Sequence, residues 1–180
     1  MFACEQQPQE EISFEVTEVK ALCSARFQKG DSIPYDDRWL VRALPQEVQF
    51  HEVAEQKGSN WPHTPVAFSQ AEKTFLSDEF GYVLIRIGDY AADTSAFHHL
   101  LDTYNELPDE SKKFIRPQQK AFGWINYEPQ RQFFNLQAGI NYRFGLDIRI
   151  FKKKLTSEKI GKGQLWKIWE SIDFNQLMAH

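Results

Sequence analysis

The sequence predicts an α+β fold: a single mixed domain with a short antiparallel or mixed sheet and three to four helices. Residues 142–150 alternate strictly between apolar and polar side chains, which is typical of a strand with one face toward a core. Residues 97–107 carry apolar side chains at helical spacing, which indicates a helix with one buried face. Helix and strand patterns do not alternate regularly along the chain, so a doubly wound sheet is not expected.

Length and composition are those of one globular domain. The chain has 180 residues, of which 42% are hydrophobic and 26% charged, enough to bury a core without disulfides. Fifteen phenylalanines and five tryptophans favour an aromatic-rich core or pocket. A net charge of -4 gives no general attraction to nucleic acid or anionic membrane, so neither is expected as a partner. No apolar run reaches the roughly 20 residues that span a bilayer.

The domain organisation expected is a flexible N-terminus over residues 1–11 and one globular domain over 12–180. The loop at 57–65, rich in glycine and proline, is a candidate internal boundary. Cys4 and Cys23 have neither metal-ligand spacing nor a disulfide pattern. We therefore expect a reducing, cytoplasmic setting.

The first half of the chain has weaker secondary-structure signals. Short strands are expected at 12–16, 38–44 and 48–53. Ser69 is followed three residues later by Glu72, the spacing of a capping box, which predicts a helix over about 69–80.

The elements after residue 80 are clearer. Residues 82–87 form an apolar run typical of a strand buried on both faces. A helix over 94–107 should pack its apolar stripe against that strand. Pro108 suits the first turn of another short helix, which Pro117 would end.

The C-terminal third should contain a hairpin and a helix. Residues 133–138 are expected to pair with 142–150 across a turn that contains Gly139. A last helix should begin near Gly163, with apolar residues repeating on one face.

Six residues are candidates for ligand binding because they combine aromatic surface, amides and guanidinium groups: Trp124, Asn126, Tyr127, Asn135, Arg143 and Arg149. Arg143, Asp147 and Arg149 should share one strand face, where arginine could bind a carboxylate with two hydrogen bonds. The commoner alternative is an Arg–Asp–Arg ladder on an exposed sheet face.

No catalytic or metal-binding pattern is complete. His98 and Asp102 share a helix face and could supply two metal ligands, but a solvated pair is the commoner explanation, since no third ligand is near. His51 and Glu55 repeat this spacing. Neither a nucleophile elbow nor a phosphate-binding glycine loop is present. We therefore expect no catalytic residue, metal or cofactor.

Residues 80–85 (FGYVLI), 104–113 (YNELPDESKK) and 122–124 (FGW), followed by 132–136 (QFFNL) and 165–169 (LWKIW), resemble the N-terminal region of isopenicillin-N-synthase-like oxygenases. The resemblance implies a relative of enzymes that use non-haem iron and 2-oxoglutarate. Their iron site needs a His-x-Asp/Glu motif and a second, distant histidine. None of the five histidines here is followed by an acid two residues later. The resemblance therefore implies an oxygenase-like domain without its own iron site.

Three functions remain open on the sequence alone. The leading hypothesis is an oxygenase-like domain that acts in binding or interaction. The first alternative is an enzyme of another class that binds an anionic small molecule in an aromatic and arginine-lined pocket. The second alternative is a protein–protein adaptor. Whether the protein is an enzyme stays undecided; if it is one, the resemblance implies an oxidoreductase. The expected partner is a small anionic molecule or a protein.

Overall fold

Seven antiparallel strands form one sheet in the computed structural model, which describes residues 16–61, 67–78, 81–108, 111–154 and 157–179. The strands are β1 (Glu52–Trp61), β2 (Phe68–Ser77), β3 (Gly81–Asp89), β4 (Lys112–Arg116), β5 (Ala121–Glu128), β6 (Phe133–Ile140) and β7 (Phe144–Lys152). Their order across the sheet is β1-β2-β3-β7-β6-β5-β4. Strand β7 pairs with β3, so the C-terminal hairpin joins the N-terminal strands to the rest of the sheet.

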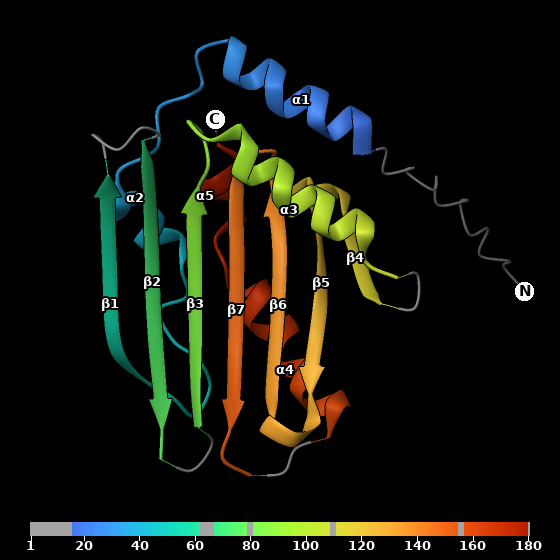
Figure 1. Ribbon diagram of the computed structural model, residues 1–180. Helices are drawn as coiled ribbons and strands as arrows, with labels where there is room; N and C mark the ends of the chain where they lie inside the picture. Colours follow the sequence, from blue (N-terminus) through green and yellow to red (C-terminus); the bar gives the residue numbers. More distant parts are fainter. Residues whose placement is uncertain (1–15, 62–66, 79–80, 109–110, 155–156, 180) are drawn as a thin grey trace, which may run out of the picture.

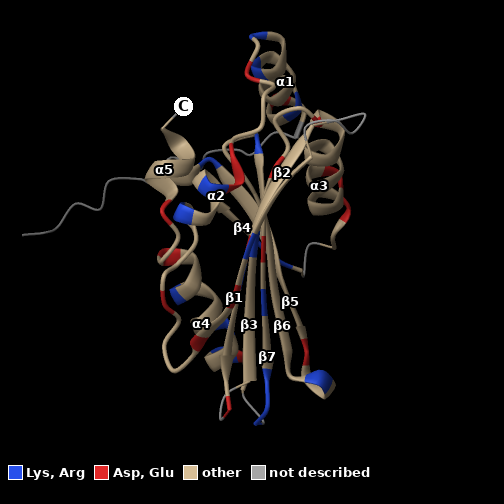
Figure 2. Ribbon diagram, turned by 90° about the vertical axis from the view of Figure 1, so that its left-hand side faces the viewer, with Lys and Arg blue, Asp and Glu red and all other residues tan. Residues whose placement is uncertain are grey.

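Helices cover both faces of this sheet. They are α1 (Val16–Gln28), α2 (Asp37–Ala43), α3 (Thr94–Glu106), α4 (Glu158–Glu170) and α5 (Phe174–Met178), with two short 3-10 turns. Helices α1 and α3 lie side by side over one end of one face, whereas α2, α4 and α5 lie on the other face (Figures 1 and 2). The predicted α+β class is confirmed, with more helices among the described residues than expected.

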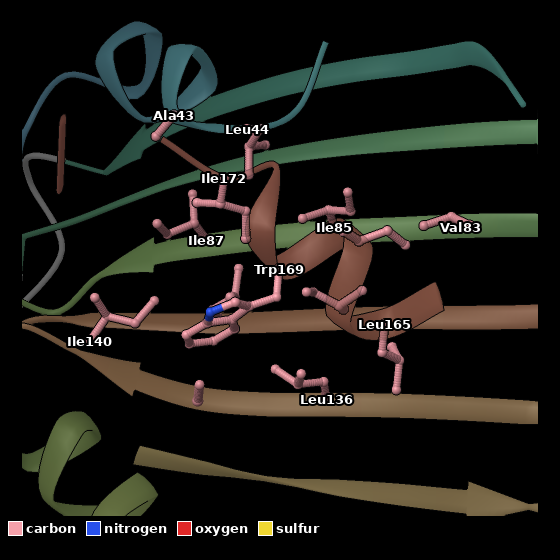
Figure 3. Packing of buried hydrophobic residues seen from close by; sticks show 14 of the residues in the cluster. Ala43, Leu44, Val83, Ile85, Ile87, Leu136, Ile140, Leu165, Trp169 and Ile172 are labelled. Atoms are coloured by element: carbon pink, nitrogen blue, oxygen red, sulfur yellow. The ribbon is translucent and has the colours of Figure 1, made fainter. Parts of the chain in front are cut away.

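The main core lies between the sheet and α4. Alternate residues of β3, β6 and β7 point to this side, and Leu165 and Trp169 of α4 pack over them (Figure 3). The labelled sheet residues that contribute are Val83, Ile85, Ile87, Leu136 and Ile140. The other sides of β3 and β7 are only half-buried. The prediction that residues 82–87 are a strand is therefore confirmed, but burial on both faces is wrong.

A smaller core joins α1 and α3 to the opposite face. Phe97 and Leu101 of α3 pack with Val19 and Cys23 of α1 and with Phe122 of β5. The Phe97 and Phe122 rings meet edge to face with centroids 5.8 Å apart. The predicted helix and its buried stripe are thus confirmed, but its main partners are α1 and β5–β7 rather than β3.

Three glycines in register allow aromatic rings to lie directly on this face. Gly139, Gly145 and Gly88 are aligned across β6, β7 and β3. A Cβ at Gly139 would lie 2.4 Å from the Phe122 ring, and one at Gly145 would lie 2.5 Å from Tyr90. Larger residues would displace both rings.

The helix predicted over 69–80 is wrong, because this segment contains strand β2. Ala71 and Phe75 are buried against the main core, whereas Glu72 lies on the opposite face, which is the period of a strand. Glu72 pairs with Arg86 of β3 instead of completing a capping box. Tertiary pairing here outweighs a local capping signal.

Residues 38–44 also differ from the prediction. They lie mainly in helix α2, whose N-cap Asp36 accepts a hydrogen bond from the Arg38 N–H. Strand β1 begins only at Glu52, after an isolated bridge between Val48 and His51. The strand predicted at 12–16 and the flexible terminus at 1–11 fall almost entirely outside the described residues, and Val16 begins α1.

Three other boundaries are corrected. The segment after Pro108 contains strand β4, not a helix, because it pairs with β5. The β6–β7 pairing is confirmed, but its turn is formed by Asn141 and Tyr142, whose φ values are 50° and 55°. Such positive values at two central residues fit a tight hairpin turn of type I′. The last long helix begins earlier than Gly163, at Glu158.

Candidate functional site

The six predicted ligand-binding residues do not converge on one pocket. Strand alternation places Trp124, Asn126, Asn135 and Arg149 on the face that carries α1 and α3. Tyr127 lies on the opposite face, where its ring stacks on Phe134 with centroids 4.4 Å apart. The pocket expected from Trp124, Tyr127 and Asn135 is therefore not formed.

Arg143 has a structural role at one end of the sheet. Its side chain is buried, and its Nε and one terminal nitrogen each donate to a different oxygen of Asp89 at 2.8 Å. It also donates to Asp31 and to the Ile33 carbonyl, and its guanidinium lies 3.8 Å from the Tyr35 ring centroid. Burial alone would lower the pKa of Arg143, but the hydrogen bonds and charge of Asp89 raise it overall. Arg143 thus fastens the 31–35 segment to the sheet.

Arg143 is therefore not part of the predicted ladder with Asp147 and Arg149. Arg149 and Asp147 do form an ion pair, at 2.6 Å. Beside them, Arg86 donates to Glu72 through Nε at 2.8 Å, and Arg86 lies opposite Asp147 in the strand register. These charges lie on the half of the sheet face that no described helix covers (Figures 1 and 2), which we call the open face. Alternating charges on neighbouring strands stabilise the strand register.

The histidines do not form a metal site in the described part of the chain. Asp102 pairs with Lys20 of α1 at 2.5 Å rather than with His98. The Nδ1 atom of His51 lies 2.8 Å from the Gln49 carbonyl. No group of three His, Cys, Asp or Glu side chains comes together there. Burial raises the pKa of the Cys23 thiol, which disfavours the reactive thiolate.

A groove lies on the opposite side of the sheet, between the segment 47–52 and helix α4. Its volume is about 1210 Å³. It is lined by Glu47, Val48, Gln49, Phe50, His51, Glu52, Lys152, Ser157, Ile160, Gly163, Gln164, Lys167, Ile168 and Ser171. Phe50 and Ile160 expose 68% and 64% of their surface on the two sides. The groove therefore combines exposed apolar side chains on its rims with a mostly polar lining, which makes it a candidate binding site.

Phe50 is held in an unusual backbone conformation. Its φ is 64°, in the left-handed region that a bulky residue seldom adopts. The His51 N–H donates to the Val48 carbonyl at 3.0 Å and closes a tight turn around it. Glycine or asparagine is the usual residue at such a position. The turn therefore displays an exposed phenylalanine at an energetic cost, and strain of this kind is common at functional sites.

Two glycines give α4 its position and leave space in the groove. A Cβ at Gly161 would lie 2.0 Å from the Phe134 ring, so this glycine allows the helix to approach the sheet. Gly163 lines the groove, and a Cβ there would meet nothing within 4 Å. The groove therefore has free space beside α4 at Gly163.

The groove floor carries a partly buried amine. Lys152 follows Ile150 on the same side of β7, so it points toward α4 and the groove. Burial lowers the pKa of Lys152, because removal of water disfavours its charged form. Lys167, Glu47 and Glu52 also line the groove, and all three are exposed, so Lys152 is its one partly buried charge. An anion bound near Lys152 would offset its lost hydration.

Sequence patterns did not reveal this groove. Its walls come from segments about 100 residues apart, and neither has a recognised motif. The available signals were Gly161 and Gly163 inside a helical pattern and a phenylalanine in a polar segment. The role of the two glycines can be recognised only when the distance between α4 and the sheet is known.

None of the described helices combines the length and apolar character needed to cross a membrane. Comparison with known proteins identifies no relative: the chain matches no protein-family model, no curated protein and no solved structure.

Proposed function

We propose that this protein is a non-catalytic binding domain whose site is the groove between residues 47–52 and α4. The occupant is a small amphipathic anion, with its apolar part between Phe50 and Ile160 and its charged group near Lys152. The observation that carries the proposal is the exposed Phe50 ring, held at a φ of 64° on the rim of the groove.

The chemistry of the lining supports this class of ligand. A hydrocarbon chain that covers the two exposed apolar side chains removes their surface from water. This burial favours binding by about 25 cal/mol per Å² of apolar surface. An anionic group near Lys152 would gain a charge-assisted interaction in a partly dehydrated place. A cationic amphiphile would bring a like charge toward the same amine.

The test compares two ligands that share a dodecyl chain but differ in charge: dodecanoate and dodecyltrimethylammonium, both below their micelle concentrations. We expect titration calorimetry to detect saturable binding of dodecanoate and much weaker binding of the cation. Lys152→Met should reduce this preference. Equal affinities for the two ligands would contradict the proposed charge selectivity.

Gly163 provides a matched pair of variants. Gly163→Leu should fill the groove and weaken dodecanoate binding about tenfold or more, which corresponds to about 1.4 kcal/mol. Gly163→Ala should bind nearly as well as the parent. Ile33→Ala removes another exposed apolar side chain, outside the groove, and should leave affinity unchanged. Unaltered dodecanoate binding by Gly163→Leu would contradict the proposal that the ligand binds in this groove.

The relation to iron- and 2-oxoglutarate-dependent oxygenases stays a prediction from residues 80–136 and 165–169. Ferrous iron and 2-oxoglutarate added to the protein should give no metal-to-ligand absorption band if the domain lacks an iron site. A stoichiometric band would contradict the non-catalytic part of the proposal. A reducing, cytoplasmic setting is likewise a proposal, supported by the low cysteine content.

A further inference from the structure

Strand β1 forms one edge of the sheet, and no described strand pairs with its outer side. It is 10 residues long, and all of its residues except Ser59 are exposed. Figure 2 looks onto this edge, with the helices on either side of the sheet. A long edge strand offers a row of backbone donors and acceptors to another strand.

The usual protections of such an edge are weak here. β1 contains no proline and has only one cation, Lys57, in its length. A register irregularity at Val53 and Glu55 is the one local distortion among its pairs with β2. Asn60 is fixed at the end near α2 by a 2.8 Å hydrogen bond to Asp37. From Glu55 to Trp61 the strand pairs with β2 without a further irregularity, so this part of its edge is continuous.

We propose that β1 pairs in antiparallel orientation with β1 of a second copy, around a two-fold axis at Gln56. The two seven-stranded sheets would then join into one continuous sheet. In this register Glu55 of each copy lies opposite Lys57 of the other, on the same side of the sheet. The proposal is independent of the groove and its ligand.

Charge selects this register over its neighbours. In a symmetric antiparallel pair, the residue at the axis faces its own copy. An axis at Glu55 would place two carboxylates opposite each other, and an axis at Lys57 would place two ammonium groups opposite each other. Directly opposed unlike charges stabilise strand pairs by about 0.2–1 kcal/mol, and like charges destabilise them. Only the axis at Gln56 places Glu55 opposite Lys57 in both directions, while Glu52, the third charged residue of β1, lies opposite the neutral Asn60.

The 2.7 Å ion pair between Glu55 and Lys57 within one strand does not oppose this arrangement. Both side chains are about half-exposed, so exchange of partners across the axis requires little burial. The contact is mainly backbone pairing, with a small apolar area. It should therefore be weak, concentration-dependent and sensitive to salt.

Charge reversal supplies a test with a positive outcome. Sedimentation velocity over a concentration series should detect a reversible dimer of the parent protein. Glu55→Lys and Lys57→Glu should each weaken self-association about tenfold or more, because each places like charges across the axis twice. An equimolar mixture of the two variants should form a heterodimer, and the double variant E55K/K57E should dimerise like the parent.

A folding control separates loss of self-association from loss of structure in the variants. Lys57 also lies opposite Glu72 within the chain, so Lys57→Glu needs a circular dichroism check that it is folded. Glu55 lies opposite Thr74 instead, and Glu55→Lys should fold normally. A parent protein that stays monomeric at high concentration would overturn the proposal. So would single variants that dimerise as well as the parent, or a mixture that shows no heterodimer.

Discussion

Two arginines on one hairpin show how burial decides the role of a side chain. Arg143 is 2% exposed and bonded to Asp89, which is itself fully buried. The side chain of Arg149 is 37% exposed and pairs with Asp147 on the open face. In the sequence the two arginines fall on the same face of the expected strand, but in the structure one side chain is buried and the other is partly exposed.

Arg143→Met should lower the free energy of unfolding by about 3–5 kcal/mol, because it leaves the Asp89 carboxylate buried without its cation. Arg143→Lys should also be destabilising, since an ammonium group cannot reproduce the paired hydrogen bonds. Arg149→Met is the matched control and should cost under about 1 kcal/mol. Urea unfolding of the three variants measures this; similar losses at both positions would mean that the buried clamp is wrong.

Lys73 should make stability depend on pH. Its ammonium group is buried and donates to the Pro45 carbonyl at 3.0 Å and to Gln46 Oε1 at 3.2 Å. Burial lowers its pKa from the ordinary value of 10.5. Between the lowered pKa and 10.5 the unfolded chain binds more protons than the folded one, so stability from this group rises with pH. Below that range the full cost of burying the charge is present.

The measurement is the difference in free energy of unfolding between the parent and Lys73→Met, taken from neutral pH toward pH 10. We expect the difference to move in favour of the parent as pH rises. Effects of the tyrosines and of Lys152 are shared by both proteins and cancel. A constant difference, or one that moves in favour of Lys73→Met, would contradict a lowered pKa.

At the level of elements, helix α4 depends on two glycines with opposite requirements. Gly161→Ala should destabilise the protein by about 1–3 kcal/mol, because the new methyl group overlaps the buried Phe134 ring. Gly163→Ala should stabilise it by up to about 1 kcal/mol, since alanine favours a helix and meets no neighbour there. Thermal and urea unfolding compare the pair directly. The same sign for both variants would show that the helix is placed incorrectly.

Helix α3 should depend on its apolar stripe and not on its histidines. Leu101→Ala should cost about 2–5 kcal/mol, because it opens a cavity in the small core shared with α1. His99 is exposed, and His99→Ala should cost well under about 1 kcal/mol. Urea midpoints distinguish the two. A large loss at His99 alone would restore the metal-ligand interpretation of the histidine pair.

For the whole molecule, the strand order predicts a gradient of local stability. Strands β3, β7 and β6 are paired on both sides and cover the main core, so their amides should exchange most slowly with solvent. Amides of the edge strands β1 and β4 should exchange faster. Hydrogen exchange followed by mass spectrometry at low protein concentration measures this gradient. Slower exchange in β1 than in β7 under those conditions would contradict the strand order.

Local periodicity was sufficient to predict helix α3, strands β3 and β7, and the pairing of β6 with β7. Each of these has a clear apolar pattern, and the hairpin partners are close in sequence. Residues 69–77 and 38–44 were assigned to the wrong elements, because their caps and short apolar runs suit more than one conformation. Only the pairing of β2 with β3 and the packing of α2 on the main core decide between them.

The candidate site depends still more on tertiary structure. The sequence identified a polar and aromatic set, but strand alternation divides Trp124 and Tyr127 between two faces, and burial removes Arg143 from any ligand surface. The sequence by itself determined the fold class and the elements with strong periodicity, because these follow from contacts between near neighbours. The strand order, the groove and the free edge were decided by tertiary structure, because they depend on pairings and packing between segments far apart in the chain.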